Sequence, residues 1–128
     1  MANRRITLTK EGTARLDRIM MELGLQDKRP EAMRIALAKG LIEATKVPEL
    51  PEGSSGFTFG DGTIAKDMDY VMLKHLIIEK VAHPIEDKDI DKYILRFAEY
   101  GLKVMENEMD SLSSLDNYLL YLTEKAVK

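Results

Sequence analysis

The first residues of the chain alternate between polar and apolar types. Between residues 5 and 9 this period of two predicts a short half-buried strand, with Ile6 and Leu8 on its inner face. The outer face then carries Arg5, Thr7 and Thr9. A strand this short cannot satisfy its own backbone groups, so it needs a partner strand.

Two helices follow, and each has recognisable ends. Thr9 suits the N-cap of the first helix, because its hydroxyl can accept a hydrogen bond from the amides of the first turn. Apolar residues then recur with helical spacing up to Leu23, and Gly24 is typical of a helix end. The second helix starts at Pro30 and ends before Pro48. Small residues on it allow close approach of a partner helix: Ala32, Ala36, Ala38 and Gly40.

The rest of the chain predicts three more helices. Residues 47–62 are rich in Pro and Gly and predict a loop, in which Phe57 and Phe59 alternate with polar residues and suit either a short strand or a clip onto the core. A helix over residues 64–82 is apolar around most of its circumference, which predicts a central position. Asp87 suits the cap of the next helix, and the serines between 111 and 114 separate it from a last one.

The fold class is therefore mainly α, with a short N-terminal strand, about five helices and a ribbon-helix-helix-like N-terminal unit. We expect a single domain over residues 1–128, in which a basic strand-helix-helix unit (1–46), a loop (47–62) and an acidic helical part (63–128) follow one another.

The amino-acid composition excludes several classes of function. The chain has 128 residues, of which 45% are hydrophobic and 32% charged, and it contains no Cys. Disulfides, thiolate catalysis and a cluster held by cysteine are therefore excluded. No signal peptide or long apolar run is visible, so we expect a cytoplasmic protein without membrane contact. We find no nucleophile–base motif, no phosphate loop and no metal-ligand spacing, and we expect no catalysis, no cofactor and no metal.

Charge is divided unevenly along the sequence. Residues 1–46 contain ten Lys and Arg against six Asp and Glu, a net charge of +4, whereas residues 47–128 have a net charge of −7. Six of the seven arginines lie in the first segment. Because the planar guanidinium suits phosphate and guanine, this favours a nucleic-acid interface. A solvated surface of mixed charge is the ordinary alternative.

Strand, helix, turn and helix is also the order of a ribbon-helix-helix unit. Two copies would pair their strands into a ribbon, which fits the DNA major groove. The amides that open the second helix, near residues 28–31, could hold a backbone phosphate. An N-terminal strand that only closes a small helical domain is the alternative. The candidate DNA-binding residues are Arg4, Arg5, Thr7, Thr9, Lys10, Lys28, Arg29 and Arg34.

Two stretches resemble the DndE family of DNA phosphorothioation (sulfur modification) proteins. The first runs from Arg4 to Ile19 (RRITLTKEGTARLDRI) and continues through Gly24-Leu25 to residues 34–37 (RIAL). The second contains His83, Glu86-Asp87 and the segment FAEYGLKVM at residues 97–105. The sequence departs from the family pattern in the turn at residues 27–29 and in the tail after Glu106.

The resemblance implies a small, mainly helical, non-catalytic protein that oligomerises and binds DNA, intact or nicked, within a sulfur-modification complex. The catalytic chemistry of such a system belongs to other subunits. From the residues alone we expect a homo-oligomer, dimer or tetramer, because the lone strand and the small-residue helix face both need partners. Two alternatives remain open: a ribbon-helix-helix repressor or antitoxin-type regulator, and a helical protein-interaction module.

Overall fold

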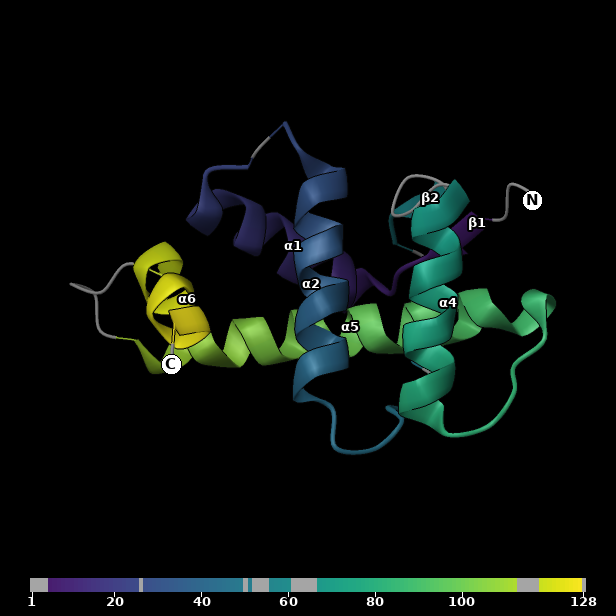
Figure 1. Ribbon diagram of the computed structural model, residues 1–128. Helices are drawn as coiled ribbons and strands as arrows, with labels where there is room; N and C mark the ends of the chain where they lie inside the picture. Colours follow the sequence, from purple (N-terminus) through teal and green to yellow (C-terminus); the bar gives the residue numbers. More distant parts are fainter. Residues whose placement is uncertain are drawn as a thin grey trace.

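The longest helix, α5 (Asp87–Ser111), runs through the middle of the protein and carries much of its core (Figure 1). In this computed structural model, residues 5–25, 27–49, 51, 56–60, 67–112 and 118–127 are described. Fully buried side chains recur along α5 with helical spacing: Ile90, Ile94, Phe97, Leu102 and Met105. They belong to one hydrophobic cluster that also includes residues of the basic N-terminal unit, so the two charged halves share a core.

Helix α2 (Arg29–Glu43) crosses α5 at very close range. A side chain at Gly40 would collide with the carbonyl oxygen of Phe97, and one at Gly101 would collide with the carbonyl oxygen of Ala36. Ala36 and Gly40 of α2 therefore do receive a partner helix, as the sequence predicted, whereas Ala38 is exposed. The partner is α5 of the same chain, so this face is not evidence for a second copy.

Helix α1 (Lys10–Leu23) has the predicted ends. The Thr9 hydroxyl accepts a hydrogen bond from the Gly12 amide at 2.8 Å, and Gly24 closes the helix with φ = 69°. That left-handed conformation favours glycine because it has no Cβ.

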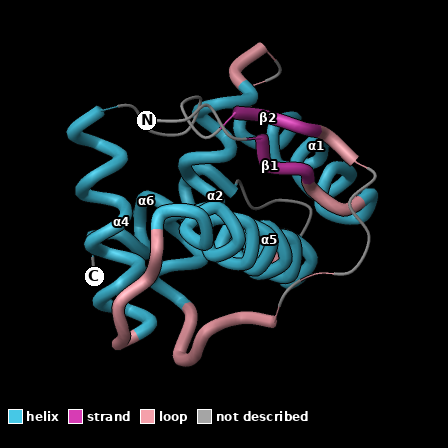
Figure 2. The backbone as a smooth tube through the Cα atoms, turned by 90° about the vertical axis from the view of Figure 1, so that its right-hand side faces the viewer, coloured by secondary structure: helices cyan, strands magenta, loops and turns pink. Residues whose placement is uncertain are grey.

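The N-terminal strand finds its partner within the chain. Strand β1 (Arg5–Thr7) pairs antiparallel with β2 (Thr58–Gly60), in the register Arg5–Gly60, Ile6–Phe59 and Thr7–Thr58. Figure 2 shows the two strands next to α1 and away from α4 (Asp67–Val81). The expectation that a second copy must pair with β1 is therefore wrong. The Phe-containing part of the loop supplies the partner strand, β2, from the same chain.

Helix α4 is not central, contrary to the sequence prediction. Tyr70 and Ile77 are buried, but Val71, Met72 and Leu76 are 44%, 61% and 54% exposed. The pattern failed because an apolar outer face looks the same in sequence as a buried one. Among the described helices, none is both long and apolar enough to cross a membrane.

Helix α6 (Tyr118–Val127) packs Tyr118 into the core and is also bound to the body through one carboxylate. Glu108 accepts hydrogen bonds from the hydroxyls of Tyr118 at 2.9 Å and Tyr121 at 3.3 Å. The same carboxylate lies 2.9 Å from the Lys39 ammonium of α2, and both charged side chains are only 11% exposed. Glu108 thus joins α2, α5 and α6. The predicted break after Ser111 is confirmed by the end of α5, and residues 113–117 lie outside the described ranges.

Candidate nucleic-acid interface

The two strands form a ribbon with one buried and one polar face. Ile6 and Phe59 point into the core, where they are 3% and 4% exposed. On the other face Arg5 is exposed, and the hydroxyl oxygens of Thr7 and Thr58 lie 2.7 Å apart. The alternation of residues 57–60 was the only sequence signal for Thr58, which we did not single out. We call the outward side chains of Arg5, Thr7 and Thr58 the ribbon face.

Thr9 does not belong to this face, contrary to the sequence prediction. It is 6% exposed, and its backbone amide donates a hydrogen bond to the Glu99 carboxylate at 2.8 Å. Its hydroxyl lies 3.2 Å from each Glu99 oxygen while it caps α1 through Gly12. The strand ends at Thr7, so the alternation does not continue to residue 9. Thr9 is a helix cap and is not available to a ligand.

Arg29 lies against the start of β2. Its guanidinium carbon is 4.5 Å from the centroid of the Phe57 ring, and its Nη2 atom is 3.2 Å from an Asp17 carboxylate oxygen. The Phe57 amide in turn donates to the Thr13 hydroxyl at 2.8 Å. Arg29 is therefore near the ribbon, as a DNA role requires, but part of its charge is already compensated.

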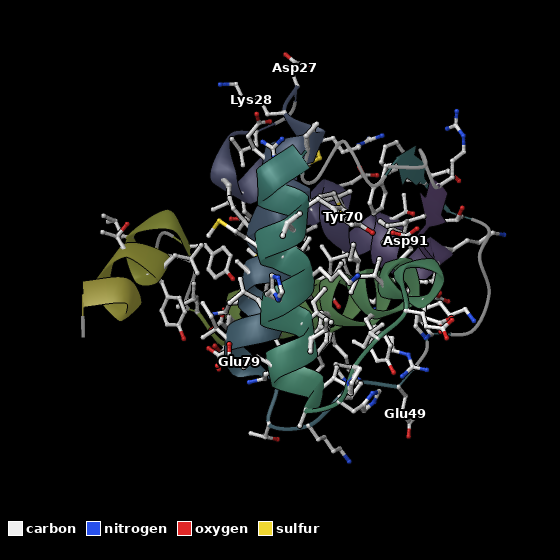
Figure 3. All side chains as sticks on the ribbon, turned by 45° about the vertical axis from the view of Figure 1, so that its right-hand side comes forward. Asp27, Lys28, Glu49, Tyr70, Glu79 and Asp91 are labelled. Carbon is white, nitrogen blue, oxygen red and sulfur yellow. The ribbon has the colours of Figure 1, made fainter. Side chains whose placement is uncertain are left out.

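The remaining candidates are spread along the basic unit. Lys10 is exposed at the first turn of α1, and Lys28 is exposed at the N-cap of α2, where it makes no side-chain cap. Lys28 stands beside Asp27 at the tip of the α1–α2 turn (Figure 3). Arg34 is exposed on α2 and lies 3.9 Å from Glu31. Arg4 is outside the described residues.

The charge division of the sequence is partly cancelled in three dimensions. Arg15 lies 3.2 Å from Glu106, and Arg18 lies 2.7 Å from Asp110, so two basic residues of α1 face acids of α5. The hydrogen bond that Arg18 donates to the Asp110 carboxylate raises the pKa of Arg18 above its ordinary value. Arginines that count toward the positive segment in sequence are thus neutralised by the negative segment in the fold.

Among the candidate residues that the structure describes, three cations have no such compensation. Within the described ranges, Arg5, Lys10 and Lys28 take part in no ion pair. Arg5 is the first residue of β1 and belongs to the ribbon face, whereas Lys10 opens α1 three residues after the strand ends. Acids that lie farther than about 8–10 Å from these cations are largely screened at physiological salt.

The described residues contain no group of three or more His, Asp or Glu side chains that could hold a metal ion. A scan of the chain against protein-family models gives no match, and a search of curated proteins gives none either.

Proposed function

We propose that this protein is a non-catalytic, cytoplasmic, DNA-binding subunit of a DNA phosphorothioation (sulfur modification) system. In this proposal it contacts DNA through the ribbon face and the neighbouring cations. The observation that carries the proposal is the polar outer face of the β1–β2 ribbon, with Arg5 exposed and free of ion pairs within the described part of the chain. The resemblance to the DndE family supplies the biological setting.

The ribbon suits DNA because of its width and its chemistry. The major groove admits a two-stranded antiparallel ribbon. In the fold this ribbon forms inside one chain, so one copy can present it without a second. Arg5 donates in a planar fork that matches a phosphate or a guanine, and the Thr7 and Thr58 hydroxyls can each donate or accept. Phosphate contacts position a protein on DNA without regard to sequence, which fits a modification subunit.

Lys10 at the first turn of α1 and Lys28 at the tip of the α1–α2 turn (Figure 3) add exposed positive charge to the basic unit. Each exposed cation that reaches a phosphate displaces a condensed counterion, so it increases the salt dependence of binding. Arg29 and Arg34 contribute less, because each already lies near a carboxylate. We therefore rank Arg5 first, Lys10 and Lys28 next, and Arg29 and Arg34 last among the candidate contacts. Arg4 stays a candidate from the sequence.

A ribbon-helix-helix repressor is the second reading, and the fold weakens it. In that reading the strands of two copies pair with each other, but β1 is here paired with β2 of its own chain. The third reading, a helical interaction module, gains support from the exposed apolar residues of α2 and α4. It does not exclude DNA binding on another side of the molecule.

Binding to three duplexes separates the readings. The purified protein is titrated with a random intact duplex, the same duplex carrying a nick, and candidate operator sequences, at low and moderate salt. A modification subunit binds the three with similar affinity and co-purifies with the catalytic proteins of its system. A repressor prefers one operator by about 10³-fold or more. Absence of binding at low salt contradicts a DNA role.

A further inference from the structure

A polar cavity lies at the start of α5, where the chain arrives from α4 (Figure 1). Its volume is about 420 Å³, within the range of roughly 300–1,000 Å³ that is usual for small-molecule sites. Six polar or aromatic side chains line it: His83, Glu86, Asp89, Lys92, Tyr93 and Arg96. We call it the α5 cavity. Within the described residues, none of the candidate DNA contacts lines it, so the proposed DNA interface does not account for it.

Arg96 is the one arginine outside the basic segment, and no acid compensates its charge in the described part of the chain. Among the described residues it forms no ion pair, although Glu86 and Asp89 line the same cavity. Its Nε atom is shielded from solvent and has no hydrogen-bond acceptor there. Buried donors in folded proteins nearly always have a partner, so this guanidinium has donor capacity left for a ligand.

Tyr93 holds two basic side chains at the cavity wall. The Arg96 guanidinium carbon lies over its ring, 5.1 Å from the centroid. This contact orients the cation but offers its N–H groups no oxygen acceptor, so they stay available to an anion. The His83 ring meets the same tyrosine at a steep angle, with the ring centroids 6.4 Å apart.

The backbone fixes the hydrogen-bonding role of His83. Its Nδ1 atom lies 2.9 Å from the Pro84 carbonyl oxygen. Because a carbonyl oxygen only accepts, Nδ1 carries the proton and donates, and Nε2 is the nitrogen left for a ligand. The cavity thus presents an oriented arginine, an oriented histidine and the flexible Lys92.

We propose that the α5 cavity binds a small sugar phosphate. Arg96, His83 and Lys92 contact the phosphate group, because a guanidinium fork, an imidazole and an ammonium all suit phosphate oxygens. Glu86 and Asp89 accept hydrogen bonds from the sugar hydroxyls, since an ionised carboxylate only accepts. An inorganic anion would gain nothing from the two carboxylates, whereas a ligand with both groups uses both kinds of wall.

The two carboxylates leave the cavity attractive to a phosphate. Asp89 lies 3.6 Å from Lys92, and the two side chains are 39% and 66% exposed, so this ion pair is weak and Lys92 can turn to the ligand. Glu86 is the N-cap of α5, where the helix dipole favours a negative charge. Each acid therefore already has a positive neighbour within the fold.

NMR of the full chain tests the proposal, because the chain has two histidines and one of them lines the cavity. At constant pH, ribose 5-phosphate should shift the His83 ring signals with a dissociation constant below about 1 mM. The ring of His75, exposed on α4 outside the cavity, is the internal control and should not move. Ribose and inorganic phosphate each carry half of the chemistry and should bind at least about tenfold more weakly.

Adenosine monophosphate distinguishes a nucleotide from a free sugar phosphate. Binding as tight as that of ribose 5-phosphate, or tighter, supports the proposal, because the sugar phosphate is common to both. Binding of the nucleotide alone overturns it, since the base would then carry the recognition.

Two variants assign the binding to this cavity. Arg96→Gln should bind ribose 5-phosphate at least about tenfold more weakly, because it loses a charged hydrogen-bond donor. Arg34→Gln is the matched control, an exposed arginine of α2 outside the cavity, and should bind as the wild type does. Lys92→Gln changes an exposed side chain that the fold does not need, and it should also weaken binding, so the test does not depend on the folding of Arg96→Gln.

Three results overturn the proposal. One is the absence of a His83 shift at about 10 mM ribose 5-phosphate. Another is equal binding of inorganic phosphate, which would leave an adventitious ion only. The third is an unchanged affinity in folded Arg96→Gln or in Lys92→Gln. All of these measurements are made without DNA, so their outcome is independent of the proposed DNA role.

Discussion

The Glu99 carboxylate of α5 lies at the N-terminal end of α1, where it accepts a hydrogen bond from the Thr9 backbone amide at 2.8 Å. An anion is favourable there, because the free amides and the dipole of a helix make its N-terminus positive. Gly12 leaves room for the carboxylate, since a Cβ at that position would collide with it. This contact fixes the junction between β1 and α1 on the central helix, and with it the direction of the ribbon.

Removing the carboxylate should destabilise the fold. Glu99 is 7% exposed, so Glu99→Ala leaves the Thr9 amide without an acceptor in a buried position. We expect the free energy of unfolding to fall by about 2–3 kcal/mol, as measured in urea. Glu106→Ala is the control: it removes the ion pairs with Arg15 and Arg18, in which the side chains are 24% to 41% exposed, and it should cost no more than about 1 kcal/mol. Equal losses in the two variants would contradict a special role for Glu99.

The crossing of α2 and α5 should not tolerate a methyl group. Gly40→Ala and Gly101→Ala each place a Cβ against a backbone carbonyl of the other helix, which cannot move as a side-chain end can. Overpacking of this kind costs about 1–3 kcal/mol or more, and we expect the upper part of that range. Thermal unfolding provides the measurement, with the exposed Lys103→Ala on α5 as a control expected within about 0.5 kcal/mol of the wild type. A wild-type melting temperature in both glycine variants would show that the helices are farther apart.

The stability of the protein should fall at alkaline pH through Tyr118. Burial, followed by the hydrogen bond to Glu108, raises the pKa of this phenol above its ordinary value near 10. Its contribution is therefore fully present below about pH 10 and is lost as the pH rises toward the folded-state pKa, because the unfolded chain releases the proton first. The loss is at most about 1.4 kcal/mol per pH unit.

Tyr118→Phe isolates this effect from the titration of the lysines. The variant should be about 1 kcal/mol less stable at neutral pH, because it loses the hydrogen bond to Glu108. Between pH 10 and 11 its stability should decline less steeply than that of the wild type. Parallel curves in urea unfolding across this interval would show that Tyr118 does not titrate differently in the folded state.

Local signals in the sequence predicted the local structure well. Thr9 and Gly24 mark the ends of α1 because capping depends on a few neighbouring atoms. The serines after residue 110 marked the end of α5 at Ser111. The alternation around Phe57 and Phe59 allowed a short strand or a clip onto the core, and the structure has a strand at Thr58–Gly60. The start of α5 differed by one residue, since Glu86 rather than Asp87 is its N-cap.

Pairing between distant segments was not predictable in the same way. The partner of β1 is about 50 residues away, and no feature of Arg5–Thr7 identifies β2 rather than a second copy. The apolar breadth of α4 gave no sign that part of it faces outward. The charge division suggested a basic surface over all of residues 1–46, but Arg15 and Arg18 find acids 91 and 92 residues later in the chain.

The contrast between Arg5 and Arg18 tests the central claim of DNA binding through the ribbon face. Both are arginines of the basic segment, but Arg5 has no ion-pair partner in the described part of the chain, whereas Arg18 lies 2.7 Å from Asp110. The measurement is the salt dependence of affinity for a random duplex with the wild type, Arg5→Ala and Arg18→Ala. We predict that Arg5→Ala weakens binding and lowers the slope of log K against log salt by about one unit, while Arg18→Ala leaves the slope unchanged. An unchanged affinity for folded Arg5→Ala, or an equal loss in both variants, would contradict the account.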